Sequence, residues 1–87
     1  MARGRGAASP QDKEASLLIS KKIKELLKET GKKQVELSRE TGIPASTLTG
    51  YIKGTSLPIA ANLEKIARFF EVEVEEIDPR YRLIADI

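Results

Sequence analysis

The sequence predicts an all-α protein in which five helices form one domain. Apolar residues recur at spacings of three and four along most of the chain, which is the pattern of helices with one buried face. Glycine or proline stands where four of the five patterns stop. The one alternating stretch, residues 71–74, is too short for a convincing strand. A length of 87 residues accommodates one domain and no more.

The first helix is predicted over Pro10–Thr30 and is most regular between 18 and 30. Ser9 can cap it, proline suits its first position, and Asp12 completes a capping box. Gly31 ends it. Its apolar stripe consists of Ala15, Leu18, Ile19, Ile23, Leu26, Leu27 and Thr30.

The next two helices are separated by a very short connection. We expect one at Gln34–Thr41 and the other at Pro44–Lys53, with a tight turn at Gly42-Ile43 between them. Gly54 stops the second of these helices. Lys33 stands at the capping position of the first, where a serine or threonine would cap better.

Two further helices follow a loop at residues 55–58. The longer one is expected at Ile59–Phe70, where apolar side chains gather on one face. The shorter one is expected at Val74–Ile77, because Pro79 stops it.

The composition excludes several classes of site. The chain has no cysteine and no histidine, so it has no disulfide, no thiolate or imidazole metal site and no nucleophile with a histidine base. We expect no cofactor, no metal and no enzymatic activity. The longest apolar runs, such as Leu17–Ile19, have three residues, which excludes a transmembrane helix and a signal-peptide core. We interpret the protein as soluble and cytoplasmic.

The charge is distributed unevenly. Residues 1–54 carry 11 Lys/Arg and 6 Asp/Glu, a net charge of +5, whereas residues 55–87 carry 4 and 7, a net charge of −3. A basic first part is typical of a protein that binds a polyanion such as nucleic acid. Solvated helix faces that happen to differ are the alternative.

A set of five spaced residues indicates a two-helix unit with a defined geometry. Ser38 is a small residue where the two helices would cross, and Gly42 suits a left-handed turn between them. Leu48 and Tyr51 would hold the second helix down from inside, with Gln34 at the start of the first. This is the helix-turn-helix arrangement, which presents its second helix to a DNA major groove.

The same stretch resembles a known family. Gln34–Gly54, QVELSRETGIPASTLTGYIKG, looks like the phage-repressor/Cro-type helix-turn-helix. The similarity continues through Leu57–Ile77, LPIAANLEKIARFFEVEVEEI, which matches the family's fourth and fifth helices. The resemblance implies a five-helix, lambda-repressor-like bundle at residues 10–78, with the helix-turn-helix at residues 34–53. It also implies a sequence-specific transcriptional regulator, typically a repressor of phage or mobile-element type, that binds double-stranded operator DNA as a homodimer on a two-fold site.

Three departures from the family pattern stand out. Lys33 replaces a small hydroxyl cap, and Glu71 replaces a frequent glycine after the fourth helix. Ala45 and Gly50 stand where many members carry long polar side chains. The last departure bears on how this chain would read bases.

The exposed side of the third helix provides the candidate base-reading residues. Serine and threonine hydroxyls can bond several base edges, and alanine or a threonine methyl can touch a thymine methyl. These candidates are Ala45, Ser46, Thr47, Thr49 and Gly50. Gly50 either lets the backbone approach DNA closely or relieves crowding against a neighbouring helix.

Candidate phosphate contacts surround the same helix pair. Phosphate contacts position a protein on DNA without carrying sequence information. The candidates are Gln34, Lys32, Lys33, Lys53, Thr55 and Ser56, although any single lysine can instead be a solvated surface charge. Tyr51 is expected in the core, with phosphate contact as the alternative.

The two ends of the chain leave alternatives open. Residues 1–9 are predicted to be a flexible basic arm that either enters a minor groove or makes no specific contact. Residues 79–87 are a tail or linker, either because the chain is a fragment of a longer repressor or because the tail docks on itself or on a partner. A rival function is a protein-interaction module, such as an antitoxin whose acidic end holds a toxin.

Overall fold

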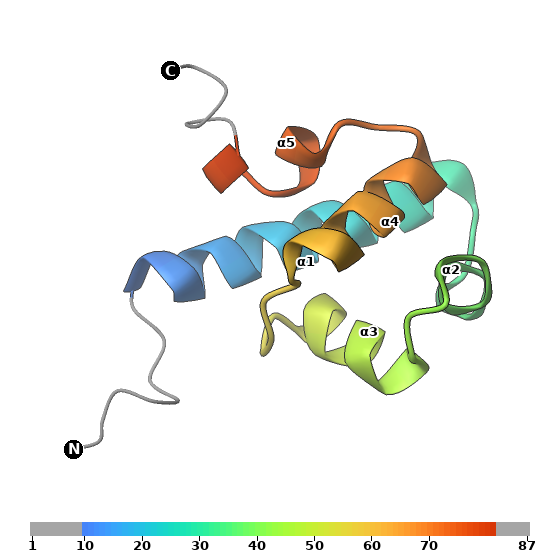
Figure 1. The fold of residues 1–87 in the computed structure, drawn as a ribbon, viewed down its shortest axis with the longest axis horizontal. Helices are drawn as coiled ribbons and strands as arrows, with labels where there is room; N and C mark the ends of the chain where they lie inside the picture. The colour runs from blue at the N-terminus through green and yellow to red at the C-terminus, as the bar shows by residue number, and fades with distance from the viewer. Residues whose placement is uncertain (1–9, 82–87) are drawn as a thin grey trace.

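The computed structural model describes residues 10–81, which form a bundle of five α-helices (Figure 1). The helices are α1 (Pro10–Thr30), α2 (Gln34–Thr41), α3 (Ala45–Lys53), α4 (Ala60–Phe70) and α5 (Val74–Ile77). No strand occurs within the described part of the chain. The all-α prediction is therefore confirmed. The predictions for the basic arm and for residues 82–87 lie outside the described residues.

Two helices begin one residue later than predicted. Pro44 and Ile59 have extended backbones, with ψ of 144° and 163°, so they cap α3 and α4 and do not start them. Each carbonyl still accepts a helical hydrogen bond, from the N–H groups of Leu48 (3.1 Å) and Leu63 (3.0 Å) respectively. A capping residue shares the helix's first hydrogen bond while its own dihedral angles lie outside the helix, which explains the difference of one residue.

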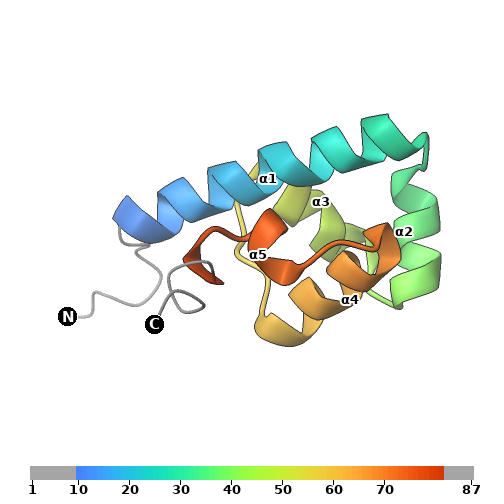
Figure 2. The ribbon, with the colours of Figure 1, turned by 90° about the horizontal axis from the view of Figure 1, so that it is seen from above.

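The core consists of aliphatic side chains from all five helices. α1 runs along one side of the bundle, with α3 and α5 beside it and α4 on the far side, as the two perpendicular views together show (Figures 1 and 2). The fully buried aliphatic side chains are Ile19, Ile23, Leu37, Ile43, Leu48, Leu63, Ile66 and Ile77. This single cluster holds the helix pair α2–α3 against the rest of the molecule.

The predicted stripe of α1 is corrected at two positions, Leu18 and Thr30, which are both exposed. Leu18 is 45% exposed, whereas Ser16 and Ser20 are buried. The Ser20 hydroxyl donates to the carbonyl of Ile52, and the end of α3 lies close to this part of α1. Small serines let α3 approach α1, so the helix face that is buried differs from the most apolar face.

A buried carboxylate fixes the chain after α5. Asp78 is fully buried, and it accepts hydrogen bonds from the backbone N–H of Arg80 (3.0 Å) and from the Nη2 of its guanidinium (2.6 Å). The guanidinium also lies 3.8 Å from Asp12 on α1. The hydrogen bond that Arg80 donates to Asp78 raises the pKa of Arg80, and the charged guanidinium holds the turn against α1.

Candidate nucleic-acid interface

The turn between α2 and α3 has the geometry that its residues predict. Gly42 ends α2 in the left-handed conformation, with φ of 77°, and its N–H donates to the Ser38 carbonyl. The Ser38 hydroxyl donates to the carbonyl of Ile43 at 2.7 Å, which closes the turn from inside. Leu48 and Tyr51 of α3 are buried. The inner side of α3 is thereby held in the core, and its other side faces solvent.

The outer side of α3 contains the candidate base-reading residues. Ala45 and Ser46, in its first turn, are exposed, and Thr47 is half-buried beside them. Within residues 10–81 the Ser46 hydroxyl makes no hydrogen bond, so its donor and acceptor are both available to a ligand. This surface is small and carries no acidic residue along α3.

A hydrogen bond joins the start of α2 to the outer side of α3. The Nε2 of Gln34 donates to the Oγ1 of Thr49 at 3.0 Å, and that hydroxyl donates to the carbonyl of Ala45 at 2.9 Å. The sequence interpretation assigned Gln34 to phosphate and Thr49 to bases separately, and it missed their pairing. No local pattern indicates a contact between residues 15 positions apart.

Gly50 lies against the loop that follows α3. A Cβ atom added to Gly50 would stand 2.7 Å from the Oγ of Ser56 and 3.6 Å from the Oγ1 of Thr55. The backbone N–H groups of both residues donate to the carbonyl of Gly50, at 3.0 Å for Thr55 and 3.3 Å for Ser56. Gly50 thus packs closely on this loop, and a Cβ atom there would require the Ser56 side chain to shift. A base contact by Gly50 stays a prediction.

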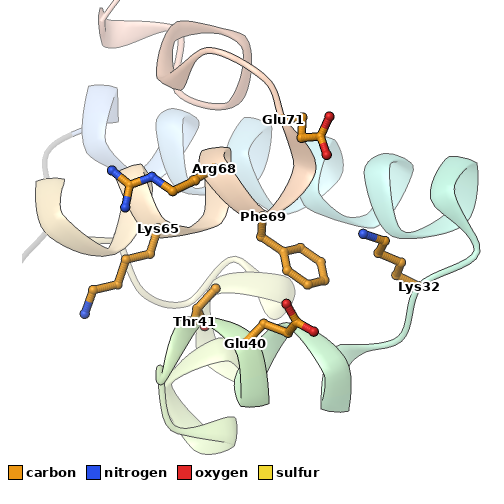
Figure 3. A pocket seen from close by; sticks show the side chains of 7 residues that line it. All are labelled: Lys32, Glu40, Thr41, Lys65, Arg68, Phe69 and Glu71. Atoms are coloured by element: carbon orange, nitrogen blue, oxygen red, sulfur yellow. The ribbon is translucent and has the colours of Figure 1, made fainter.

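The candidate phosphate-binding lysines are all exposed but differ in their surroundings. Lys33 and Lys53 flank the helix pair at the start of α2 and the end of α3. The Nζ of Lys32 lies 4.6 Å from the centre of the Phe69 ring, beside a groove also lined by Glu40 (Figure 3). This cation–π contact directs Lys32 toward α4.

Tyr51 serves the core. It is 4% exposed, and its hydroxyl accepts a hydrogen bond from the Nδ2 of Asn62 at 2.8 Å, which ties α3 to α4. Phe70 is buried, and Phe69 packs edge-on against it with ring centres 4.9 Å apart.

A family model described as helix-turn-helix matches residues 23–77, from the middle of α1 to the end of α5. The chain belongs to this helix-turn-helix family. It is also similar to the cryptic phage CTXphi transcriptional repressor RstR of Vibrio cholerae. The identity is 33% over 60 residues, which cover 69% of this chain and 54% of that protein. The chain thus spans about half the length of the curated relative it matches. No solved structure matches the chain.

These comparisons confirm the resemblance to phage-repressor-type helix-turn-helix proteins, and the structure shows how two departures are accommodated. Lys33 offers no side-chain acceptor at the cap of α2, but its backbone N–H donates to the Glu36 carboxylate at 2.9 Å. Glu71 takes the left-handed conformation that a glycine would take more readily, with φ of 59°. Both departures affect helix ends and leave the α2–α3 turn intact.

No helix among residues 10–81 is long and apolar enough to cross a membrane. Residues 10–81 also contain no group of three or more acidic side chains placed to hold a metal ion.

Proposed function

We propose that this helix-turn-helix protein is a sequence-specific DNA-binding transcriptional regulator that reads operator DNA with α3 in the major groove. The observation that carries the proposal is the outer side of α3, which is small, exposed at Ala45 and Ser46, and held in place from inside by Leu48. An α-helix with such a face fits the major groove. The family match and the similarity to a phage repressor support this proposal.

The roles of the side chains follow from their chemistry. The Ser46 hydroxyl can donate to or accept from a base edge, and the Ala45 methyl can contact a thymine methyl. Thr47 and Thr49 extend the same side of α3, where Thr49 also orients Gln34. The Nε2 group of Gln34 has a second N–H, and its carboxamide oxygen is an acceptor, so this side chain at the start of α2 can still bond to a DNA backbone.

Phosphate contacts complete the proposed interface. Lys33 and Lys53 are exposed ammonium groups on either side of the helix pair, and Thr55 and Ser56 follow in the adjoining loop. Lysine–phosphate contacts add affinity for any sequence and make binding salt-dependent. Lys32 would have to leave the Phe69 ring to contribute.

We further propose that the regulator is a repressor and binds as a homodimer. Helix-turn-helix dimers place two recognition helices about one DNA turn apart, so a two-fold protein pairs with a two-fold operator. The similar phage protein is a transcriptional repressor, which supports the direction of regulation proposed here.

Selection of bound duplexes from a random pool tests the proposal. A two-fold sequence motif with half-sites about 10 base pairs apart is the expected result. A non-palindromic motif would contradict the homodimer while preserving DNA reading. Failure to enrich any motif, together with co-purification of a second protein, would favour the interaction-module alternative.

A further inference from the structure

An apolar face on the first half of α1 is left uncovered by residues 10–81. Leu18 is 45% exposed, although neighbouring Ile19 is fully buried. Leu18 lines a hollow of about 180 Å³ together with Ala15 and Pro79, between α1 and the turn that follows α5. Leu18 and Pro79 also line an adjoining hollow of about 370 Å³. Both views of the fold place the start of α1 beside the segment after α5 (Figures 1 and 2).

The described chain ends next to this face. Arg80 holds the turn in place through Asp78 on one side and Asp12 of α1 on the other. Tyr81 is half-buried and packs against the core. The sequence continues for six residues, Arg82–Ile87. An extended chain advances about 3.4 Å per residue, so these residues reach about 20 Å from Tyr81.

We propose that residues 82–87 fold back onto this face of the same chain, with Leu83 and Ile84 covering the hollow lined by Ala15, Leu18 and Pro79. Half of these six residues are large aliphatics, namely Leu83, Ile84 and Ile87. Burying them against Leu18 removes apolar surface from water on both sides of the contact. The proposal does not depend on DNA binding.

Two observations favour this occupant over a second copy of the chain. The tail is tethered directly beside the hollow, which gives it an effective concentration of about millimolar, far above that of a dilute partner. Its first residue, Arg82, can also pair with Glu14, which lines the hollow and forms no ion pair within residues 10–81.

Disulfide trapping tests the proposal cleanly because the chain has no cysteine of its own. The test protein carries Leu18→Cys with Ile84→Cys. The matched control carries Lys28→Cys with Ile84→Cys, since Lys28 is exposed and lies about 15 Å further along the same helix. We expect the test pair to form a disulfide within one chain about tenfold faster than the control pair, at a rate independent of protein concentration.

A third protein separates docking from mere proximity. Adding Leu83→Ser and Ile87→Ser to the test pair removes most of the aliphatic surface of the tail, so trapping should slow several-fold. An unchanged rate would overturn the proposal, as would a rate equal to that of the control pair. Disulfides between chains that increase with concentration would overturn it in favour of a second copy.

Hydrogen exchange on the unmodified sequence gives an independent measurement. We expect the amides of residues 11–18 to exchange more slowly in the full chain than in a chain that stops after Tyr81, because a docked tail suppresses fraying of this end of α1. Equal exchange rates, with the rest of the bundle unchanged, would overturn the proposal.

Discussion

Ser46 and Thr49 share the outer side of α3, but their hydroxyl groups differ in what they already bind. Thr49 donates to the Ala45 carbonyl and accepts from Gln34, whereas Ser46 makes no hydrogen bond within residues 10–81. A free hydroxyl in the first turn of α3 is the better group for discriminating bases. Thr49 instead combines two tasks, because its hydroxyl positions a residue of the neighbouring helix.

Replacing Ser46 by alanine is expected to weaken binding to the selected operator by about 1–3 kcal/mol, since one base contact is lost. Affinity for random duplex and the melting temperature should stay almost unchanged, because Ser46 is exposed. Fluorescence anisotropy with both duplexes, alongside thermal melting, measures this. Equal losses of affinity for both duplexes would indicate that Ser46 contacts the DNA backbone and not a base.

Thr49→Val is expected to affect operator binding by the same order and to leave the bundle nearly as stable. The Gln34 side chain loses its partner, but it is half-buried, so water can replace the hydroxyl. The same two titrations and a melting curve check the change. A large drop in melting temperature would instead make the Gln34–Thr49 hydrogen bond a structural requirement of the α2–α3 pair.

Asp78 is the residue where a single polar change should cost most stability. Asp78→Asn leaves the guanidinium of Arg80 without its fully buried carboxylate, and we expect a loss of about 1–3 kcal/mol in the free energy of unfolding. Asp12→Asn is the matched control, because it touches the same guanidinium from the exposed side and should cost under about 1 kcal/mol. Urea unfolding of both variants measures the difference, and equal effects would contradict the role of burial.

At the scale of elements, the helix ends determine how α2, α3 and α4 are joined. Gly42 allows the left-handed residue that reverses the chain between α2 and α3, and the Ser38 hydroxyl closes that turn. After α4 the same backbone conformation falls on Glu71, a residue with a Cβ atom. Both helices therefore end in a left-handed residue. At the end of α2 this residue is Gly42, which adopts the conformation without strain, and at the end of α4 it is Glu71, which adopts it with strain.

Glu71→Gly is expected to stabilise the fold by about 0.5–1 kcal/mol. The relief of the left-handed strain, about 1–2 kcal/mol, exceeds the added entropy of the unfolded chain. Gly42→Ala is the converse variant, because φ is 77° and no heavy atom lies within 4 Å of the added Cβ. It should therefore destabilise through the backbone alone. Chemical denaturation checks both signs, and stabilisation by both variants would contradict the argument.

At the scale of the whole molecule, the residues that hold α3 in the bundle lie on its inner side, and the candidate base-reading residues lie on its outer side. The aliphatic core and the Asn62–Tyr51 hydrogen bond hold α3 from inside. On its outer side, the structural contacts are the Gln34–Thr49 hydrogen bond and the packing of Gly50 on the loop that follows. The basic first part of the chain includes both flanks of this surface, Lys33 and Lys53. The acidic second part contributes α5 and the turn at Asp78, on the side of the bundle where α1 begins.

This separation predicts how backbone contacts respond to salt. Gln34→Ala combined with Lys53→Ala should weaken binding to operator and random duplex alike, and the slope of log K against log salt should flatten by about 0.9, mainly through Lys53. Lys21→Ala is the matched control, because Lys21 is exposed and lines a hollow with residues of α5. It should change the slope little. A loss confined to the operator would reassign these residues to base reading.

The helices, the α2–α3 turn and the family were predictable from the sequence because they depend on local chemistry. Spacings of three and four defined the helices, and glycine or proline at most of their ends helped to define the limits to within one residue. Gly42 was predicted to be left-handed because a two-residue connection between helices requires it. The candidate residues of the interface were likewise identified from their positions on a helix with a known inner side.

The tertiary structure alone decided which of these residues touch one another. The Gln34–Thr49 hydrogen bond, the packing of Ser56 on Gly50 and the placement of Lys32 over Phe69 join residues from different elements. Such pairs depend on the angles and distances at which whole helices pack, and periodicity along one helix contains no information about them. For the same reason the exposure of Leu18 was missed. Leu18 belongs to the most apolar face of α1, which is the face that periodicity predicts to be buried. In the bundle, the close approach of α3 buries Ser16 and Ser20 and leaves Leu18 at the surface.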